Sequence, residues 1–98
     1  MILVIGSFTA SSGSFEQALA LSRTHVARSR AEPGCISHDV HFDAEDHNRL
    51  VFIEQWNDAA ALQAHFKVPA SRKFVHSIGQ LSSVAPTMTI YDASPIKL

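Results

Sequence analysis

The chain has 98 residues, of which 46% are hydrophobic and 17% are charged, and its formal net charge is -1 at pH 7. This length and composition predict one folded domain over residues 1–98 and exclude a largely disordered chain. The scattered Lys and Arg residues argue against nucleic-acid binding, and the single Cys35 excludes an internal disulfide. No apolar run reaches the roughly 20 residues that span a bilayer, so we expect a cytoplasmic protein without a membrane partner.

The N-terminal third of the chain predicts a strand followed by a helix. Residues 1–9 are mostly apolar and end at a small polar loop, which indicates a strand, and Gly6 marks a bulge or a close approach of neighbouring backbone. Ser14 and Gln17 have the spacing of a capping box, in which each side chain bonds to a backbone N–H at the start of a helix. Apolar residues then recur at helical spacing until the Pro-Gly pair at 33–34, where we expect the helix to end.

The middle of the chain predicts two strands joined by a charged turn. Residues 35–43 and 49–57 both alternate, so the two faces of each strand can be assigned from parity. The first strand has Ile36, His38, Val40 and Phe42 on one face, and Cys35, Ser37, Asp39 and His41 on the other. The second strand has Leu50, Phe52, Glu54 and Trp56 on one face, and Val51, Ile53 and Gln55 on the other. Both faces of this second strand are apolar in the middle.

The last third predicts two helical segments and a final strand. A helix over 58–66 is interrupted near Pro69, and Ser71 can cap a second segment. In that segment one face contains Phe74, Ile78 and Leu81. Residues 87–92 alternate as a strand. The order strand, helix, strand, strand, helix, strand is that of a ferredoxin-like α+β fold, with a four-stranded antiparallel sheet covered by helices on one face.

The opposite face of this sheet indicates how the protein assembles. The strands at 1–9 and 49–57 are apolar on both faces, yet helices can cover only one of them. A monomer rarely exposes an apolar patch of that size. We therefore expect a homodimer in which the two sheets pack against each other.

The spacing of the six histidines argues against a metal site. His38 and His41 lie three residues apart on one strand, so they point to opposite faces and only one of them can face a given cavity. His25 and His47 have no partner at a ligand spacing, and we expect them at the solvated surface. Cys35 follows a Pro-Gly turn at the start of a strand, where a small buried residue is expected rather than a nucleophile.

Trp56 and His65 form the strongest indication of a functional site. A strand that ends in Trp and turns directly into a helix carrying His can place an aromatic wall and a titratable base at one pocket. His65 can accept a proton from a phenol or quinol near neutral pH. Taken alone, each residue is also compatible with a structural role in the core. Glu54 either orients His65 or makes a structural hydrogen bond, and the structural role is favoured.

Three segments resemble the antibiotic biosynthesis monooxygenase family of dimeric α+β barrels. They are Glu32-Pro33-Gly34-Cys35, Glu54-Gln55-Trp56 and Ala60-Ala61-Leu62-Gln63-Ala64-His65-Phe66, and the similarity extends over the chain in order and spacing. The resemblance implies a dimer of ferredoxin-like subunits, each with a pocket between its sheet and its helices. It also implies oxidation of a small aromatic, quinol or polycyclic phenol by molecular oxygen without metal or flavin, so no cofactor is expected.

Carried over by position, the resemblance makes His65 the base and Trp56 the residue that orients the ring of the substrate. The remaining substrate-binding candidates are Phe42, Phe52, Phe66, Phe74, Glu54, His38 and His41. Phe52 stands where polyketide-oxidising members have a polar amide, which argues against an anthrone-type substrate. Two alternatives remain open: a dimeric barrel that binds a small hydrophobic ligand without turnover, and a haem-degrading monooxygenase, although the first strand lacks the Asn of that branch.

Overall fold

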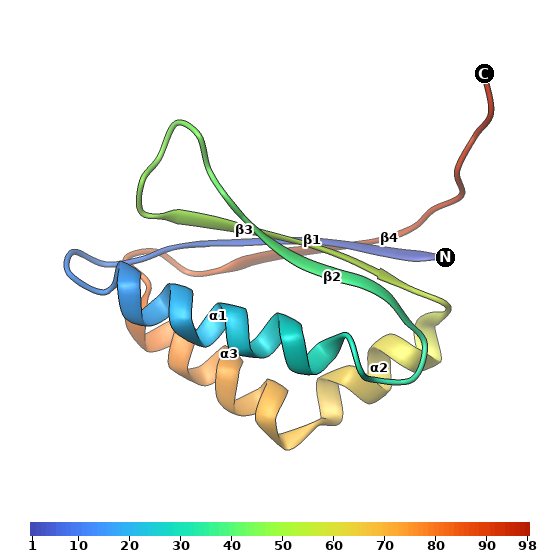
Figure 1. Cartoon of the computed structure of the whole chain (residues 1–98), viewed down its shortest axis with the longest axis horizontal. Coiled ribbons are helices and arrows are strands. Elements are labelled where there is room, and N and C mark those ends of the chain that lie inside the picture. The colour runs from blue at the N-terminus through green and yellow to red at the C-terminus, as the bar shows by residue number, and fades with distance from the viewer.

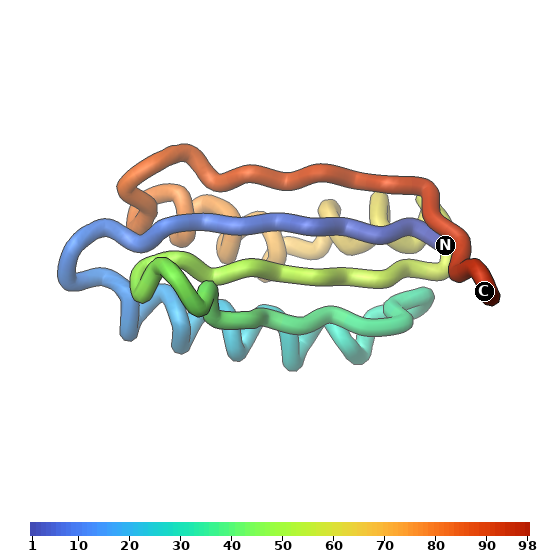
Figure 2. The backbone as a smooth tube through the Cα atoms, turned by 90° about the horizontal axis from the view of Figure 1, so that it is seen from above, coloured from blue at the N-terminus to red at the C-terminus, as the bar shows by residue number.

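The computed structural model describes residues 1–98 as a four-stranded antiparallel sheet with all helices on one face (Figure 1). The elements in chain order are β1 (Ile2–Thr9), α1 (Phe15–Ser29), β2 (Cys35–Phe42), β3 (Arg49–Trp56), α2 (Ala59–Lys67), α3 (Pro69–Leu81) and β4 (Thr87–Asp92). The strand order across the sheet is β2-β3-β1-β4, and Figure 2 shows these strands from above with the helices behind them. The predicted ferredoxin-like α+β fold is confirmed. None of its helices combines the length and the apolar character needed to cross a membrane.

Two helix starts differ from the sequence-based expectation. Ser14 precedes α1, but its side chain makes no hydrogen bond to the start of the helix, so the predicted capping box is not formed. The Ser14 hydroxyl instead accepts a hydrogen bond from the Ser11 hydroxyl at 3.3 Å. α3 begins at Pro69, because proline lacks an N–H and has a helical φ, which suits the first helical position. Ser71 therefore lies within the helix, where it is buried, and does not cap it.

An irregularity at the start of β2 changes the predicted faces of that strand. Cys35 and Ser37 pair with consecutive residues of β3, so Ile36 between them has no partner in the ladder. Such a bulge shifts the alternation of side chains by one residue. As a result Ile36 is 50% exposed, whereas Cys35 packs beside Trp56. The predicted placement of Ile36 on the same face as His38 is wrong.

The core between the sheet and the helices consists of two apolar clusters. The larger one contains Phe8, Ala10, Ala18, Leu19, Val26, Leu50, Phe52 and Ile78, and the predicted face of α3 packs against it. The smaller one contains Val4, Trp56 and Leu62, at the end of the sheet covered by α2. His38 lies between them, with its ring centroid 6.4 Å from that of Phe52 and 6.2 Å from that of Trp56. A polar side chain thus separates the two parts of the core.

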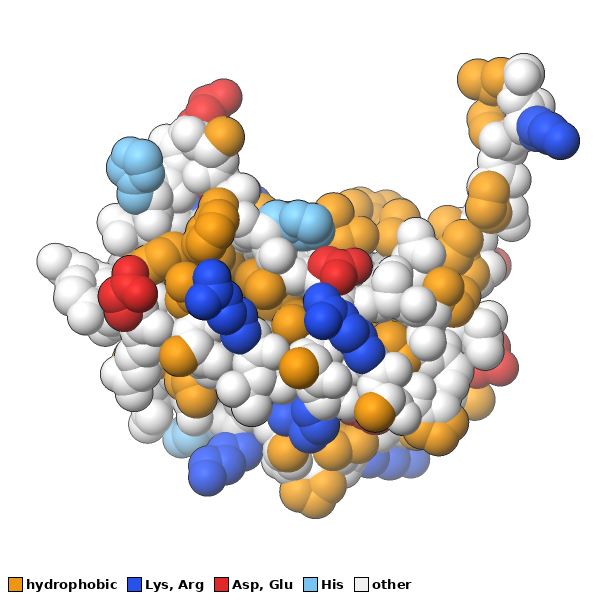
Figure 3. Space-filling model, in the orientation of Figure 1, with side chains coloured by type: hydrophobic (Ala, Val, Ile, Leu, Met, Phe, Trp, Pro, Cys, Tyr) orange, Lys and Arg blue, Asp and Glu red, His pale blue; other side chains and the backbone are white.

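The outer face of the sheet is uncovered in the single chain and has an apolar centre, flanked in the same row by Asp39 of β2 and Thr89 of β4. Ile5 of β1 pairs with Ile53 of β3 at the centre of this face, and they are 41% and 38% exposed. The segment 93–98 projects away from the body of the molecule, and Figure 3 shows hydrophobic side chains along it. Ile96 and Leu98 in this tail are 79% exposed and fully exposed, respectively.

The turn between α1 and β2 approaches α2 closely at a glycine. Gly34 has φ +81°, and its carbonyl accepts the backbone N–H of Asn57 at 2.8 Å. A Cβ atom on Gly34 would lie 2.5 Å from the Cβ of Ala61. α2 itself is fixed at its start by Asp58, whose carboxylate accepts the N–H of Ala61 at 2.8 Å. The absence of a side chain at Gly34 therefore sets the distance between this turn and α2.

Gly34→Ala should destabilise the protein more than Gly13→Ala. Both glycines have φ +81°, but nothing lies within 4 Å of a Cβ built on Gly13. The positive φ costs an alanine about 1–2 kcal/mol at either position, and the contact with Ala61 adds about 1–3 kcal/mol at Gly34. Urea unfolding measures both losses. Made in an Ala61→Gly background, which has its own cost in helix α2, Gly34→Ala should lose only the positive-φ part. Equal losses for the two single variants Gly34→Ala and Gly13→Ala would contradict the close-approach argument.

Candidate active site

A cavity of about 700 Å³ lies between the inner face of the sheet and the helices. This volume is in the range of small-molecule sites. Its apolar walls include Phe8, Phe52, Phe66, Phe74, Ile78 and Met88, and its polar lining includes His25, His38, Glu54, His65, Arg72 and His76. Gly6 also lines it, and a Cβ there would lie 3.3 Å from the carbonyl oxygen of Thr87, so the glycine marks a close approach rather than a bulge.

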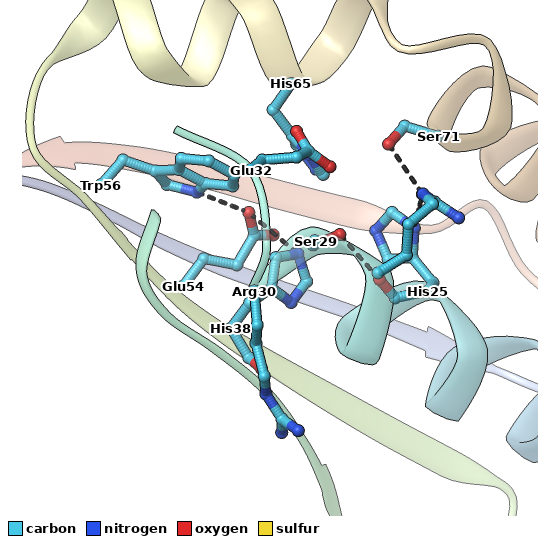
Figure 4. Close-up of polar contacts among 10 residues, drawn as sticks. His25, Ser29, Arg30, Glu32, His38, Glu54, Trp56, His65 and Ser71 are labelled. Carbon is cyan, nitrogen blue, oxygen red and sulfur yellow. Dashed lines mark hydrogen bonds and ion pairs between the residues drawn. The ribbon is translucent and has the colours of Figure 1, made fainter. Parts of the chain in front are cut away.

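Three histidines from three different elements meet at this cavity, and we call them the histidine cluster: His25 of α1, His38 of β2 and His65 of α2 (Figure 4). Their ring centroids are 5.1, 5.4 and 5.5 Å apart, and each side chain is at most 5% exposed. The expectation that His25 is at the solvated surface is wrong, because its ring stacks on Phe74 at 4.0 Å between α1 and α3. His47, in contrast, is exposed as expected.

Burial keeps His25 neutral. Desolvation, together with His38, His65 and Arg28, lowers the pKa of His25 to about 3. Arg28 Nη2 lies 2.8 Å from His25 Nδ1, where the guanidinium donates and the ring nitrogen accepts, so the proton of the neutral ring is on Nε2. Arg28 also donates to the Ser71 hydroxyl at 2.9 Å and thereby joins α1 to α3.

Glu32 orients His65. The sequence did not predict Glu32 as a residue of the site. Glu32 lies in the turn after α1, and its Oε1 is 2.9 Å from His65 Nδ1. A carboxylate only accepts, so Nδ1–H of the neutral ring donates and Nε2 keeps a free lone pair. The sole signal in the sequence was the position of Glu32 at the start of the Glu-Pro-Gly-Cys segment.

Glu54 contacts side chains of the sheet and makes no hydrogen bond to His65. The indole N–H of Trp56 donates to Glu54 Oε1 at 2.9 Å, and the same oxygen lies 3.3 Å from His38 Nε2. That second contact is short but poorly aligned, and neither ring nitrogen of His38 has a hydrogen-bond partner. Burial alone raises the pKa of Glu54, but His38 and the Trp56 N–H outweigh it and lower that pKa below its usual value. Glu54 is therefore a buried carboxylate that is ionised at neutral pH.

Trp56 lies behind His65 and outside the cavity. It is 0% exposed, its ring centroid is 4.7 Å from that of His65, and it does not line the cavity. α2 covers this end of β3, so the indole packs with Val4 and Leu62 instead of opening to a ligand. The aromatic wall expected of Trp56 is absent. Its ring supports the back of His65, and its N–H holds Glu54.

The structure divides the remaining site candidates into two groups. His38, Phe52, Glu54, Phe66 and Phe74 line the cavity. Phe42 and His41 do not. Phe42 is 63% exposed at the end of β2, next to Phe15, and His41 borders a separate hollow of about 200 Å³. Of the two histidines on β2, His38 and not His41 therefore faces the cavity, because the helices cover the face of β2 on which His38 lies.

Comparison with known proteins gives a family for this geometry. Residues 1–77 match the family model described as antibiotic biosynthesis monooxygenase. The chain belongs to this family. A crystal structure named antibiotic biosynthesis monooxygenase is 32% identical, with a TM-score of 0.89 over 97% of this chain and 100% of that one. The structure of PA3566 from Pseudomonas aeruginosa is 31% identical, with a TM-score of 0.86 over 96% of this chain and 94% of that one.

A curated relative is similar over most of this chain. The uncharacterized protein sll1783 from Synechocystis sp. is 36% identical over 90 residues, which is 92% of this chain. The same match covers 61% of that relative, so this chain spans less than two thirds of its length.

Acid should destabilise the protein through His25. The pKa of His25 is about 3 in the folded state and 6.5 as a free side chain. The unfolded chain therefore takes up the proton first, and the free energy of unfolding falls as the pH drops below 6.5, by at most about 1.4 kcal/mol per pH unit.

Urea unfolding in EDTA between neutral pH and about pH 4 measures this slope. His25→Phe keeps a flat ring against Phe74 and should flatten the slope. His47→Gln, at an exposed histidine, should leave it as in the wild type. A wild-type slope in the His25→Phe variant would contradict the assignment.

Proposed function

We propose that the protein is a cofactor-independent monooxygenase that oxidises a small quinol or polycyclic phenol with molecular oxygen. The observation that carries this proposal is the Glu32–His65 pair at the cavity. The carboxylate holds Nδ1 at 2.9 Å, which leaves Nε2 of a buried, cavity-lining histidine as a proton acceptor. A positioned histidine is the common general base for a hydroxyl proton.

The proposed reaction needs only a base and a dry pocket from the protein. His65 Nε2 takes the phenolic proton, and Glu32 stabilises the resulting imidazolium. The phenolate is a stronger reductant than the phenol and passes electrons to oxygen. For a hydroquinone, one oxygen atom enters the ring and the other leaves as water, so hydroquinone and O₂ give hydroxyquinone and H₂O. The walls at Phe52, Phe66 and Phe74 hold the ring and exclude water.

Trp56 acts in this proposal as a positioning residue. It is fully buried behind His65 and donates to Glu54, so it fixes two groups of the site without reaching the substrate. The orientation of the substrate ring is then the task of the phenylalanine walls. Phe74 stacks on His25 and has its ring centroid 6.0 Å from that of Phe52, so two of these walls adjoin the histidine cluster directly.

His65→Gln should abolish most oxygen consumption. Without the base, we expect a fall in kcat of about 100-fold or more in the presence of EDTA. Glu32→Gln should give a smaller fall, because the amide carbonyl can still accept from Nδ1 but does not stabilise the imidazolium. An oxygen electrode with a panel of hydroquinones and polycyclic phenols measures these rates, and His47→Gln serves as the matched control.

Two outcomes would contradict the proposal in different ways. An unchanged rate in the His65→Gln variant would remove His65 as the base. Absence of oxygen consumption by the wild-type protein with every substrate would reject the catalytic proposal. A hydrophobic ligand retained on purification, identified unaltered by mass spectrometry, would then favour the ligand-binding alternative.

We also propose that the protein is a homodimer formed by packing of the outer sheet faces. Ile5 and Ile53 lie opposite each other at the centre of this face and are substantially exposed, although both are β-branched and apolar. Helices already cover the inner face, so a second copy of the same sheet is the complementary surface that the chain itself supplies.

Sedimentation at micromolar concentration should give about twice 10.7 kDa. Ile53→Lys places a charge at the centre of the proposed interface and should shift the protein toward the monomer. Val84→Lys replaces an equally apolar residue that is 62% exposed outside the sheet and should leave the dimer intact. A monomeric wild type would refute the packing proposal.

A further inference from the structure

We propose that the histidine cluster is a binding site for a divalent transition-metal ion. One ring nitrogen from each of His25, His38 and His65 lies within 4.8 Å of the other two. Nitrogens bound at about 2.0–2.1 Å to one tetrahedral ion are about 3.3 Å apart, so the rings must close by at most about 1.5 Å. Metal binding therefore requires the three imidazole rings to rotate toward one another at their buried positions.

A second observation points to a ligand at the same place. His38 is 1% exposed; its Nε2 lies 3.3 Å from Glu54 Oε1 without a well-aligned hydrogen bond, and its Nδ1 has no partner. Buried polar atoms in folded proteins are nearly always paired, so an incompletely paired imidazole among two others indicates a missing partner. Since this ring faces two histidines that also border the cavity, a bound cation satisfies it directly.

The charges around the cluster also favour a cation. Two carboxylates adjoin it: the side chains of Glu32 and Glu54 are 15% and 7% exposed. Two arginines contact the cluster: Arg28 donates to the ring of His25, whereas the half-exposed Arg30 donates to the backbone carbonyl of His38 and pairs with Asp39. Glu32 moreover accepts from Nδ1 of His65, and a carboxylate behind a ligating histidine is the usual outer partner in metal sites. A divalent ion would thus offset the negative charge that these two residues bring into the core.

The donor set limits the kind of ion. Three neutral imidazoles suit Zn²⁺, Fe²⁺, Co²⁺, Ni²⁺ or Cu²⁺, whereas Mg²⁺ and Ca²⁺ require oxygen ligands. Three protein ligands beside a cavity leave a coordination position open to a small molecule, which is the arrangement of catalytic rather than structural sites.

Arg28 opposes this site in the metal-free protein. Its guanidinium donates to His25 Nδ1, which leaves a proton on the Nε2 nitrogen. To ligate through Nε2, His25 must carry its proton on Nδ1, and Arg28 must release that atom while keeping its bond to Ser71. In Arg28→Gln, the amide oxygen of the new side chain can accept a hydrogen bond from Nδ1–H of His25. This variant should therefore bind the metal more tightly.

Metal binding and the proposed base role use the same lone pair of His65 and are alternatives. The oxygen-consumption experiments above are done in EDTA, whereas metal binding is measured without substrate. Failure of one proposal is therefore distinguishable from failure of the other.

The test titrates Co²⁺ into the untagged, metal-free 98-residue chain and follows the visible absorption of the bound ion, with Zn²⁺ calorimetry alongside. We expect one ion per chain and no response to Mg²⁺. His38→Gln and His65→Gln should each weaken binding at least tenfold, and Arg28→Gln should strengthen it several-fold. His41→Gln and His47→Gln, at exposed histidines outside the cavity, are the controls and should bind as the wild type.

Absence of stoichiometric Co²⁺ or Zn²⁺ binding would overturn the proposal. So would binding that survives both His38→Gln and His65→Gln, or that is lost in the His47→Gln control, because the ion would then be held at the surface. His25→Gln provides a third variant if either of the first two fails to fold by circular dichroism.

Discussion

The contact between the turn after α1 and the helix α2 is the constraint on which the site depends. Gly34 has no side chain, so Ala61 can lie against it, and Ala61 and His65 are one helical turn apart on the same face of α2. Glu32, two residues before the glycine, then reaches His65 at 2.9 Å. A backbone close approach thus determines whether the histidine has an oriented ring with a free nitrogen.

Around this contact the core departs from a simple apolar interior. Two hydrophobic clusters are separated by polar side chains that come from α1, β2, β3 and α2. Within that polar layer the ionised Glu54 is held by Trp56, and the neutral His25 is held by Phe74 and Arg28. Burial of such groups lowers the free energy of unfolding unless they are well paired. This polar layer is therefore explained by function rather than by folding.

The sequence allowed the order of strands and helices to be predicted because side-chain periodicity is a local property. It did not reveal the bulge at Ile36, since an unpaired residue depends on the register with β3. For the site, the helix carrying His65 was predictable, whereas His25 and Glu32 were not, because tertiary packing brings α1 and its following turn to α2. Trp56 was placed at the correct end of its strand, but periodicity does not report that α2 covers it.

Because of the bulge in β2, the number of residues in that strand does not fix which of its side chains point inward. Cys35 and His38 are three residues apart, yet they pair with Trp56 and Glu54, which are two residues apart and share a face. Loss of Ile36 would make the ladder regular and leave both side chains pointing inward. The beginning of β2 is therefore a place where relatives can gain or lose one residue while His38 keeps its position at the cavity.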